Sequence, residues 1–465
     1  MSAFQELIDA KGRRISRRDL FLSMGVNTVA GSFGAAWLSM TFGMPLIMFM
    51  QAIGASGLVI GMVTTVRLLA MAAQIPAALA SEGLHSRKLF WLGCALVHRL
   101  LWFSMAGIAL WCSPFNPWLP LAILTIVCVS DSMGNAAVAP WLSWMTDLIP
   151  LPISGRFWGT RQSVITVASL AGLVLAGQIL DASRDPVSGE AQGRGFAIVF
   201  AVAACLGVAD VLVHLFVREP RPTPSPRGGA IHRRILAPFA SRNFRLLTLS
   251  LGAWNFGLSM ITAFSLIYLK RDFGVTYSQL AALSIANALG AIVTGYSVGE
   301  MLDRIGSRRL GGLMFLATPL PLLPWLFVNH STIRFGPLVY PQSIAILCIA
   351  GVVSGGIYSA VTLCQLRLAA ELTSPSGRTM SMAVHWSFVG LLSALGPTAG
   401  GLVMDRFPAH LHLTIPSGLP FSFYHAQLIL FTVLLWFVAL PLLLAIRPGA
   451  ATPAATAAPH QVPMT

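Results

Sequence analysis

The strongest constraint on this chain is a succession of apolar runs, each roughly 20 residues long, separated by short polar segments. A helix of about 20 residues crosses the hydrocarbon core of a bilayer, and lipid offers no partner to backbone groups outside a helix. Of the 465 residues, 55% are hydrophobic and 10% are charged, which excludes a soluble domain with an ordinary surface. The sequence therefore predicts an all-α membrane protein.

Twelve such runs predict twelve transmembrane helices. Their expected ranges are 21-50, 57-80, 89-111, 118-141, 162-181, 194-217, 246-269, 278-298, 309-328, 342-363, 382-404 and 424-446. A segment with seven Arg and one acid, 218-245, divides them six and six. The predicted organisation is a cytoplasmic tail (1-20), a first bundle (21-217), a basic cytoplasmic linker (218-245), a second bundle (246-446) and a disordered cytoplasmic tail (447-465).

The basic residues predict the orientation, because Lys and Arg accumulate in short cytoplasmic loops. Placing the N-terminus inside puts most of the 30 Lys and Arg in cytoplasmic segments, with Arg156 and Arg161 in one of these loops. We expect both termini on the cytoplasmic side of the inner membrane. The net charge of +14 is explained by this topology and by anionic lipid, so no nucleic-acid partner is expected. We expect a monomer in the bilayer.

The two halves of the sequence repeat one another. LHSRKL at 84 to 89 aligns with IGSRRL at 305 to 310, and DLIPLPISGR at 147 to 156 aligns with ELTSPSGR at 371 to 378. The aligned helix ends are Gly172, Gly177 and Asp181 in the first half and Gly396, Gly401 and Asp405 in the second. Matches in register predict two pseudo-symmetric six-helix bundles.

The segment GEMLDRIGSRR at 299 to 309 is dense in charge and lies between two apolar runs. It fits the loop signature G-x-x-x-D-R-x-G-x-R-R, and the chain resembles the major facilitator superfamily of secondary transporters over about residues 17 to 447. The first-half copy, ASEGLHSRK at 80 to 88, departs from the signature, with Glu82 in place of the Asp. The resemblance implies alternating access around a site near the bilayer midplane.

Charged side chains at cytoplasmic helix ends suit a gate, since they pair when the mouth closes and hydrate when it opens. Asp303 is expected to accept from Arg304, from Arg308 or from a nearby helix N-terminus. Asp147 is expected to pair with Arg156, and Glu371 with Arg378. The expected gate residues are Asp303, Arg304, Arg308, Arg309, Glu82, Asp147, Arg156, Glu371 and Arg378. The alternative is that they are ordinary topology determinants on hydrated loops.

Ionisable residues also lie within the predicted helices, where each costs about 2.5 to 3.5 kcal/mol on insertion scales. Counting along the helices places Arg67, Arg99 and Asp131 near mid-membrane. In the arrangement that the resemblance implies, Arg67 and Asp131 are on adjacent helices. We expect Asp131, partnered by Arg67 or Arg99, to couple transport to protons or another cation; the alternative is a static salt bridge that fixes helix packing. Asp210, with His214 one turn later, is expected to be structural.

By the same resemblance, helices 1, 4, 7 and 10 line the substrate cavity, with 2, 5, 8 and 11 at its sides. The expected lining residues are Asn27, Asn135, Trp254, Asn255, Tyr358, Gln365 and His385. Aromatic faces beside amides suit a sugar-like solute, whereas intramembrane Arg favours an organic anion. The sequence does not rank these two, and the same residues also serve as interface anchors or helix bridges.

Motifs of nucleophilic catalysis, phosphate binding or metal ligation, such as G-x-S-x-G, a Walker loop or H-E-x-x-H, do not occur in the sequence. We therefore expect no enzyme activity, no cofactor and no metal. The predicted function is secondary transport of a small organic solute, coupled to protons or sodium. The alternatives are a drug or metabolite exporter, an uncoupled facilitator, and a transporter-like membrane sensor without flux.

Overall fold

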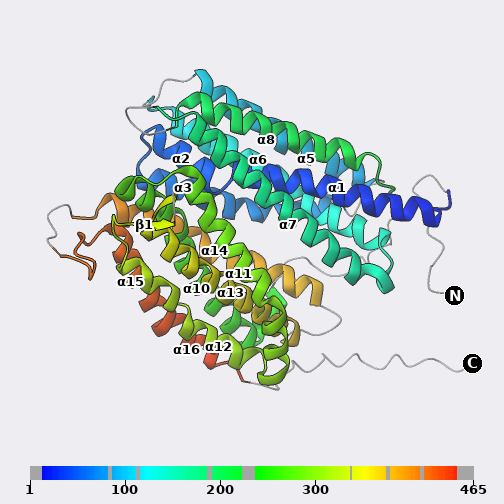
Figure 1. Ribbon diagram of the computed structural model, residues 1–465. Helices are drawn as coiled ribbons and strands as arrows, with labels where there is room; N and C mark the ends of the chain where they lie inside the picture. Colours follow the sequence, from blue (N-terminus) through cyan, green and yellow to red (C-terminus); the bar gives the residue numbers. More distant parts are fainter. Residues whose placement is uncertain are drawn as a thin grey trace, which may run out of the picture.

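The computed structural model describes residues 13–81, 86–111, 116–185, 191–221, 236–335, 338–372, 378–408 and 413–447. In Figure 1 the helices form two bundles that follow each other along the chain. The first comprises α1 (Arg17–Thr41), α2 (Met44–Ala52), α3 (Gly57–Ala70), α4 (Gln74–Ser81), α5 (Arg87–Trp111), α6 (Leu119–Leu148), α7 (Leu151–Ala182) and α8 (Gly193–His214). The second comprises α10 (Arg242–Phe273), α11 (Tyr277–Ile305), α12 (Ser307–Ala317), α13 (Gln342–Glu371), α14 (Arg378–Asp405), α15 (Phe423–Leu434) and α16 (Leu440–Leu444).

Each expected range overlaps helical structure, and ten segments of the described chain are long and apolar enough to cross a membrane. The ranges 57-80 and 309-328 are divided instead. A 3-10 turn, Met71–Ala73, separates α3 from α4, and α12 is followed by the 3-10 segment Leu320–Leu326. Prolines explain the second division, because Pro319, Pro321 and Pro324 remove backbone donors and clash with a continuing α-helix.

Helix starts follow from local side-chain chemistry. The Ser16 and Ser56 hydroxyls accept from the backbone N–H of Asp19 and Val59, capping α1 and α3. Thr276 and Gln279 form a reciprocal capping box at the start of α11. The first predicted span is divided at Gly43, whose φ of 74° belongs to the left-handed region that glycine tolerates.

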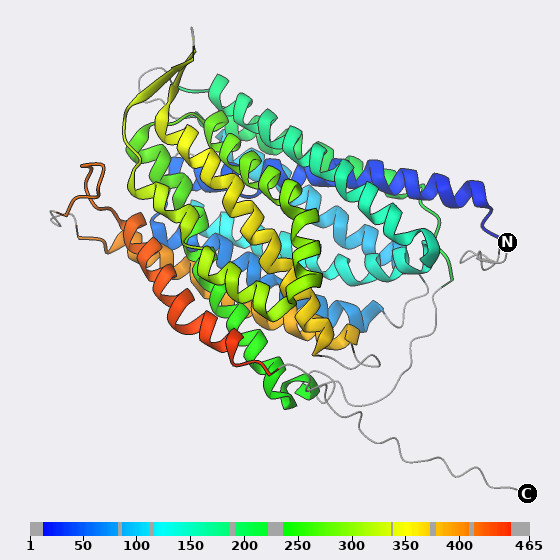
Figure 2. The ribbon, with the colours of Figure 1, turned by 60° about the horizontal axis from the view of Figure 1, so that its bottom comes forward.

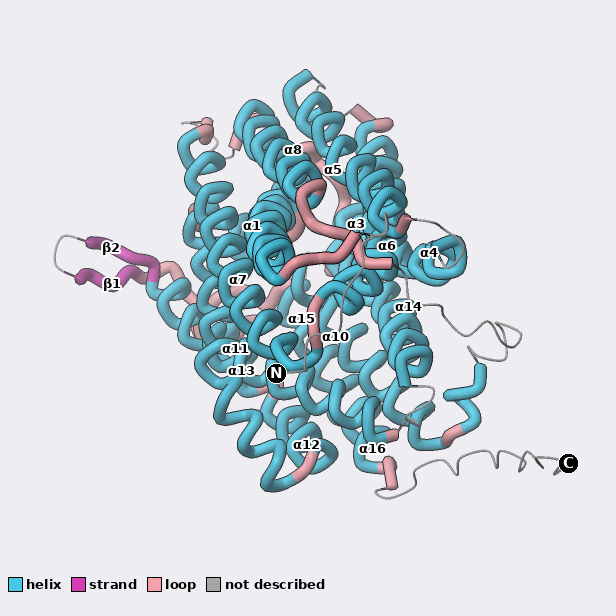
Figure 3. The backbone as a smooth tube through the Cα atoms, turned by 90° about the vertical axis from the view of Figure 1, so that its right-hand side faces the viewer, coloured by secondary structure: helices cyan, strands magenta, loops and turns pink. Residues whose placement is uncertain are grey.

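We call the end of the molecule that carries Ser16, Arg87 and Asp147 the proximal end, and the end that carries Gly57 and Asp405 the distal end. The helices of the two bundles approach one another distally and diverge toward the end that carries the N-terminus, as Figure 1 and Figure 2 both show. A hairpin of β1 (Thr332–Phe335) and β2 (Leu338–Pro341), which the sequence did not predict, projects from the helices in Figure 3.

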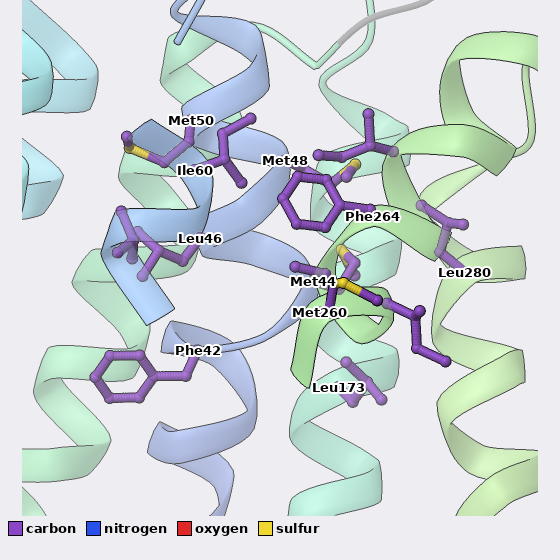
Figure 4. Close-up of a cluster of buried hydrophobic side chains, with 14 of the residues drawn as sticks. Phe42, Met44, Leu46, Met48, Met50, Ile60, Leu173, Met260, Phe264 and Leu280 are labelled. Atoms are coloured by element: carbon purple, nitrogen blue, oxygen red, sulfur yellow. The ribbon is translucent and has the colours of Figure 1, made fainter. Parts of the chain in front are cut away.

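A continuous apolar core joins the bundles near the distal end. Figure 4 shows Met44 and Met48 of α2 beside Met260 and Phe264 of α10, with Leu280 of α11 close by. All five side chains are nearly fully buried. Because methionine is unbranched and polarizable, it fills irregular gaps between packed surfaces. The core therefore provides an adaptable contact between the halves.

Candidate transport site

An ion pair joins α3 to α6 inside the first bundle. Arg67 Nε lies 2.9 Å from Asp131 Oδ2, and the two side chains are 30% and 9% exposed. The Arg67 guanidinium carbon is also 3.5 Å from the centroid of the Phe42 ring, so it makes a cation–π contact. Of the two expected partners for Asp131, the structure pairs it with Arg67.

The second intramembrane arginine has a different partner. Arg99 Nη2 lies 2.8 Å from Asp210 Oδ2, and its guanidinium carbon is 3.5 Å from the centroid of the Trp37 ring. His214, one turn after Asp210, places Nδ1 3.2 Å from Asp210 Oδ1. Arg99 thus faces α8 and not Asp131, because depth along a helix does not fix the direction in which a side chain points.

A polar relay continues from His214 to a third arginine. Arg161 Nε donates to Asn27 Oδ1 at 2.8 Å, which leaves the Asn27 Nδ2 group to donate to His214 Nε2 at 3.3 Å. Trp141 Nε1 donates to the same His214 nitrogen at 3.4 Å. His214 Nε2 thus faces two donors, while its Nδ1 lies 2.9 Å from the Asp210 carbonyl oxygen of the same helix.

This relay corrects two expectations. Arg161 was assigned to a cytoplasmic loop, but it lies inside α7, about 15 Å along the helix from Leu151. Asn27 was expected to line the cavity, yet it is fully buried in the relay. The rule that places Arg in loops fails at Arg161 because the first bundle supplies it with a buried amide and two indole faces.

A cavity of about 520 Å³ lies mainly within the second bundle and is also lined by Gly43, Met44 and Ile47 at the start of α2. Its volume is typical of small-molecule sites. Two of the residues expected to line a substrate cavity, Trp254 and Tyr358, border it, with ring centroids 5.5 Å apart and planes inclined by 29°. Its polar lining residues are Thr262, Ser265, Ser284, Asn287, Thr318 and Ser354. No charged side chain is among the described residues that line it.

Of the polar groups that α11 and α13 present to this cavity, only Tyr358 was expected from the sequence, and Ser284, Asn287 and Ser354 were not. Ser284 and Asn287 are three residues apart, and Ser354 and Tyr358 are four apart. Such spacings place side chains on one face of a helix. A search for polar stripes on the apolar helices would have found both pairs.

The remaining expected lining residues make hydrogen bonds elsewhere. Gln74 Nε2 donates to Asn135 Oδ1 at 2.8 Å. Asn255 Nδ2 donates to the Leu251 carbonyl of its own helix. Gln365 Nε2 and His385 Nε2 are 3.1 Å apart, within a buried group that also includes Thr248. Asn135, Asn255, Gln365 and His385 are not among the described residues that line the 520 Å³ cavity. Three of them, Asn135, Gln365 and His385, bridge helices.

At the proximal end, the gate residues form contacts within each bundle. Asp147 Oδ2 lies 2.6 Å from Arg87 Nη1, whereas Arg156 was its expected partner. Glu371 accepts from Ser307 Oγ at 3.0 Å and from Arg367 Nε at 2.9 Å.

Three further gate residues are described. Arg304 pairs with Glu300, and Arg308 donates to the Leu444 carbonyl. Arg309 is exposed. Residue Glu82 and the side chains of Asp303, Arg156 and Arg378 lie outside the described part of the chain, so the pairs expected for them stay predictions.

At the distal end, two aspartates join one bundle to the other. Asp405, the last residue of α14, accepts from the backbone N–H of Gly57 and Leu58 at 2.7 and 2.8 Å, at the start of α3. Asp181 near the end of α7 accepts from Tyr277 and Ser278 at 2.9 and 2.8 Å, at the start of α11. Free N–H groups and the helix dipole both favour a carboxylate there. We call these contacts the distal caps.

Glycines allow the same helices to touch through their backbones. A Cβ added at Gly61 of α3 would lie 2.2 Å from the Pro397 carbonyl oxygen of α14. One added at Gly401 would lie 2.1 Å from the Gly57 carbonyl oxygen. The sequence repeat singled out Gly401, Asp181 and Asp405, but it did not reveal that they contact the opposite bundle.

Comparison with known proteins agrees with this architecture. A family model of the Major Facilitator Superfamily matches residues 26–333 and 249–463. The chain belongs to the Major Facilitator Superfamily. It is therefore an all-α, multi-pass membrane protein with a transporter fold. Among curated relatives, a cis,cis-muconate transport protein from Acinetobacter baylyi is 25% identical over 175 residues, which cover 35% of this chain and 40% of that protein.

Solved structures of the Major Facilitator Superfamily share the fold. A variant of the nucleoside transporter NupG has a TM-score of 0.69 at 12% identity, covering 92% of this chain and 99% of that one. A bacterial homologue of the human lysosomal transporter Spinster, inward-facing and unoccupied, gives 0.65 at 17%, covering 94% and 100%. A D-xylose-proton symporter gives 0.63 at 15%, covering 90% and 97%.

Proposed function

We propose that this protein is a proton-coupled secondary transporter that moves a small organic solute across the inner membrane by alternating access, with both termini in the cytoplasm. Membership of the Major Facilitator Superfamily supports transport. The muconate-transporting relative supports an organic solute, although the match spans about 40% of that relative's length. The expectation of no enzymatic activity agrees with this family and stays a prediction.

The observation that carries the coupling proposal is the pair of Arg67 and Asp131. Both groups lie inside the bundle on different helices, and Arg67 keeps 30% of its side chain exposed. A nearby cation favours the charged form of a carboxyl, whereas burial favours the neutral form. Separating the two groups would therefore bind a proton, and reuniting them would release it.

The distal caps supply the conformational part of the proposal. If the proximal end is cytoplasmic, the caps of Asp181 and Asp405 close the outer side of the structure. Rocking of the bundles must break these caps when the proximal end closes. The charged proximal helix ends, including Arg304 and Glu371, would then approach the opposite bundle and act as the inner gate.

A neutral, sugar-like solute is the second candidate. The cavity that Trp254 and Tyr358 line, with no charged side chain among its described lining residues, favours it. Its aromatic faces and hydroxyl and amide groups match the chemistry of a polyol. Coupling at Asp131 would serve an organic anion or a sugar, so the coupling test does not depend on which of the two is transported.

The test is proton flux in proteoliposomes that hold an internal pH dye, with sugars and organic acids added in turn. We compare the wild type with Asp131→Asn and with Asp272→Asn, a control that removes a distal acid paired with its neighbour Arg271. We expect a solute-dependent pH change in wild type and control. We expect Asp131→Asn to lose it while passive solute uptake persists.

A pH change that survives in Asp131→Asn would reject coupling at this residue. Solute uptake without any pH change in the wild type would instead indicate an uncoupled facilitator. Absence of uptake for every solute, in protein shown to be folded, would favour a sensor without flux.

A further inference from the structure

Away from the helix ends, the described part of the first bundle carries more arginines than acids. Leaving out three residues at either end of each helix, the described side chains of this bundle include three arginines, Arg67, Arg99 and Arg161, and two acids, Asp131 and Asp210. The acids are taken by Arg67 and Arg99 at 2.9 and 2.8 Å. Arg161 has no carboxylate partner among the described residues. A cation inside a membrane span is costly unless an anion or water compensates it.

The surroundings of Arg161 form a built site. Its Nε is held by the fully buried Asn27 at 2.8 Å. Its guanidinium carbon lies 5.1 Å from the Trp141 ring centroid and 5.5 Å from that of Trp158. A Cβ added at Gly31 of α1 would lie 2.5 Å from Arg161 Nη2, so the absence of a side chain at Gly31 makes room for the guanidinium.

The orientation of Arg161 leaves its outer fork available. Nε is occupied by Asn27, whose own orientation is fixed by His214. Its Nη1 and Nη2 make no hydrogen bond to another described residue. These two nitrogens match the two oxygens of a carboxylate, which arginine binds with parallel hydrogen bonds. Arg161 is partly exposed and lies at the start of the apolar span Thr160–Ala182, where a charged side chain turns to the bundle interior or to water and not to lipid.

We propose that Arg161 binds the carboxylate of an organic-anion substrate, and that Trp141 and Trp158 contact the planar, unsaturated or aromatic body of that substrate. Indole rings offer such a body large flat contacts. The substrate supplies the negative charge that the bundle lacks. This inference rests on the proposed transport function and decides between its two solute classes in favour of the anion.

The test measures binding without any gradient, by isothermal titration calorimetry of the full chain in nanodiscs. The probes are cis,cis-muconate, benzoate and the neutral dimethyl ester of muconate. The variants are Arg161→Gln, Arg161→Lys, and Arg194→Gln as a control that removes an exposed arginine from the start of α8. We expect Arg161→Gln to weaken acid binding at least tenfold, Arg161→Lys to weaken it less, and Arg194→Gln to leave it unchanged. In the wild type, we expect the ester to bind more weakly than the acid. We expect the affinity for the ester to be the same in the wild type and in Arg161→Gln.

A second pair of variants guards against misfolding of Arg161→Gln. Gly31→Ala displaces the guanidinium, whereas a Cβ at Gly25 of the same helix meets no atom within 4 Å. We expect Gly31→Ala to weaken acid binding and Gly25→Ala to leave it unchanged. The proposal is overturned if Arg161→Gln binds the acids with wild-type affinity. If that variant does not fold, wild-type affinity of Gly31→Ala for the acids overturns it. So does a wild type that binds neither acid.

The binding assay and the flux assay test different proposals, and each can give a negative result without the other. Acid binding that depends on Arg161, without proton-coupled flux, leaves the anion site standing and rejects the proposed coupling. Proton-coupled uptake of a neutral sugar, without acid binding, does the reverse.

Discussion

The side chain of Arg67 reaches from α3 to Asp131 on α6, with Nε and Oδ2 2.9 Å apart. This contact joins two helices of the first bundle, one of which, α3, also receives a distal cap from the second. A change in the protonation of Asp131 therefore acts on the helix that Asp405 holds. The pair links the proposed coupling chemistry to the helix that has to move.

Breaking this pair from one side is expected to destabilise the protein. Asp131→Asn leaves Arg67 without its anion, and we expect a loss of about 1 to 3 kcal/mol in the free energy of unfolding, less than for a fully buried pair. The double variant Arg67→Gln with Asp131→Asn should recover most of that loss. Thermal unfolding in detergent measures both. A double variant as unstable as the sum of the two single changes would show that the residues are not coupled.

Removing a distal cap is expected to shift the conformational equilibrium. Asp405→Ala leaves the N–H groups of Gly57 and Leu58 without their acceptor, a loss of about 1 kcal/mol for a typical helix cap. The distally open state should become more populated, and Asp181→Ala should add a similar shift. Distances between spin labels on α3 and α14 report the change. Asp272→Asn is the control, and an unchanged distance distribution in Asp405→Ala would contradict the role assigned to the cap.

Filling a glycine contact should have a larger effect of the same sign. Gly61→Ala places a carbon 2.2 Å from the Pro397 carbonyl oxygen, a separation that requires α3 and α14 to move apart. Gly93→Ala on α5 is the control, because a Cβ there meets no atom within 4 Å. We expect a cysteine introduced at the distal end to react faster with an aqueous thiol reagent in Gly61→Ala only. Equal rates in both variants would rule out this close contact.

Trp254 offers a test of the cavity. Its Nε1 is buried without a hydrogen-bond partner, so Trp254→Phe should leave the free energy of unfolding unchanged or raise it by up to about 1 kcal/mol. Trp254→Ala should lower it by about 3 to 5 kcal/mol. The matched change Trp144→Phe should destabilise, because Trp144 Nε1 donates to the Arg218 carbonyl at 2.8 Å. Chemical unfolding of the three variants gives the comparison, and a marked destabilisation by Trp254→Phe would reveal a missing partner.

The sequence was sufficient for features that depend on length and depth. Apolar runs located the helices because a bilayer demands a fixed number of residues per span. Counting along those runs placed Arg67 and Asp131 at matching depths, and the structure forms their ion pair. The prolines from Pro319 to Pro324 also predict that the helix is divided there. The expected range 309-328 followed the length of the apolar run instead.

Features that depend on the direction of side chains could not be obtained in this way. Each residue turns the side-chain direction by about 100°, so an error of one position sends Arg99 to Asp210 and not to Asp131. The partners of Asp181 and Asp405 are backbone N–H groups on another bundle, which leave no trace in residue type. Arg161 was placed in a loop because its buried partner, Asn27, lies 134 residues away.

The distal caps define the symmetry of the interface between the bundles. Asp181 and Asp405 occupy the same place in their repeats, and each holds the start of the second helix of the other repeat. When the same residue makes the same contact in both directions, the interface is isologous, as between the two subunits of a symmetric homodimer. A single repeat would carry both halves of that contact on its own surface. The two bundles thus meet as the two subunits of a symmetric homodimer meet, although both belong to one polypeptide.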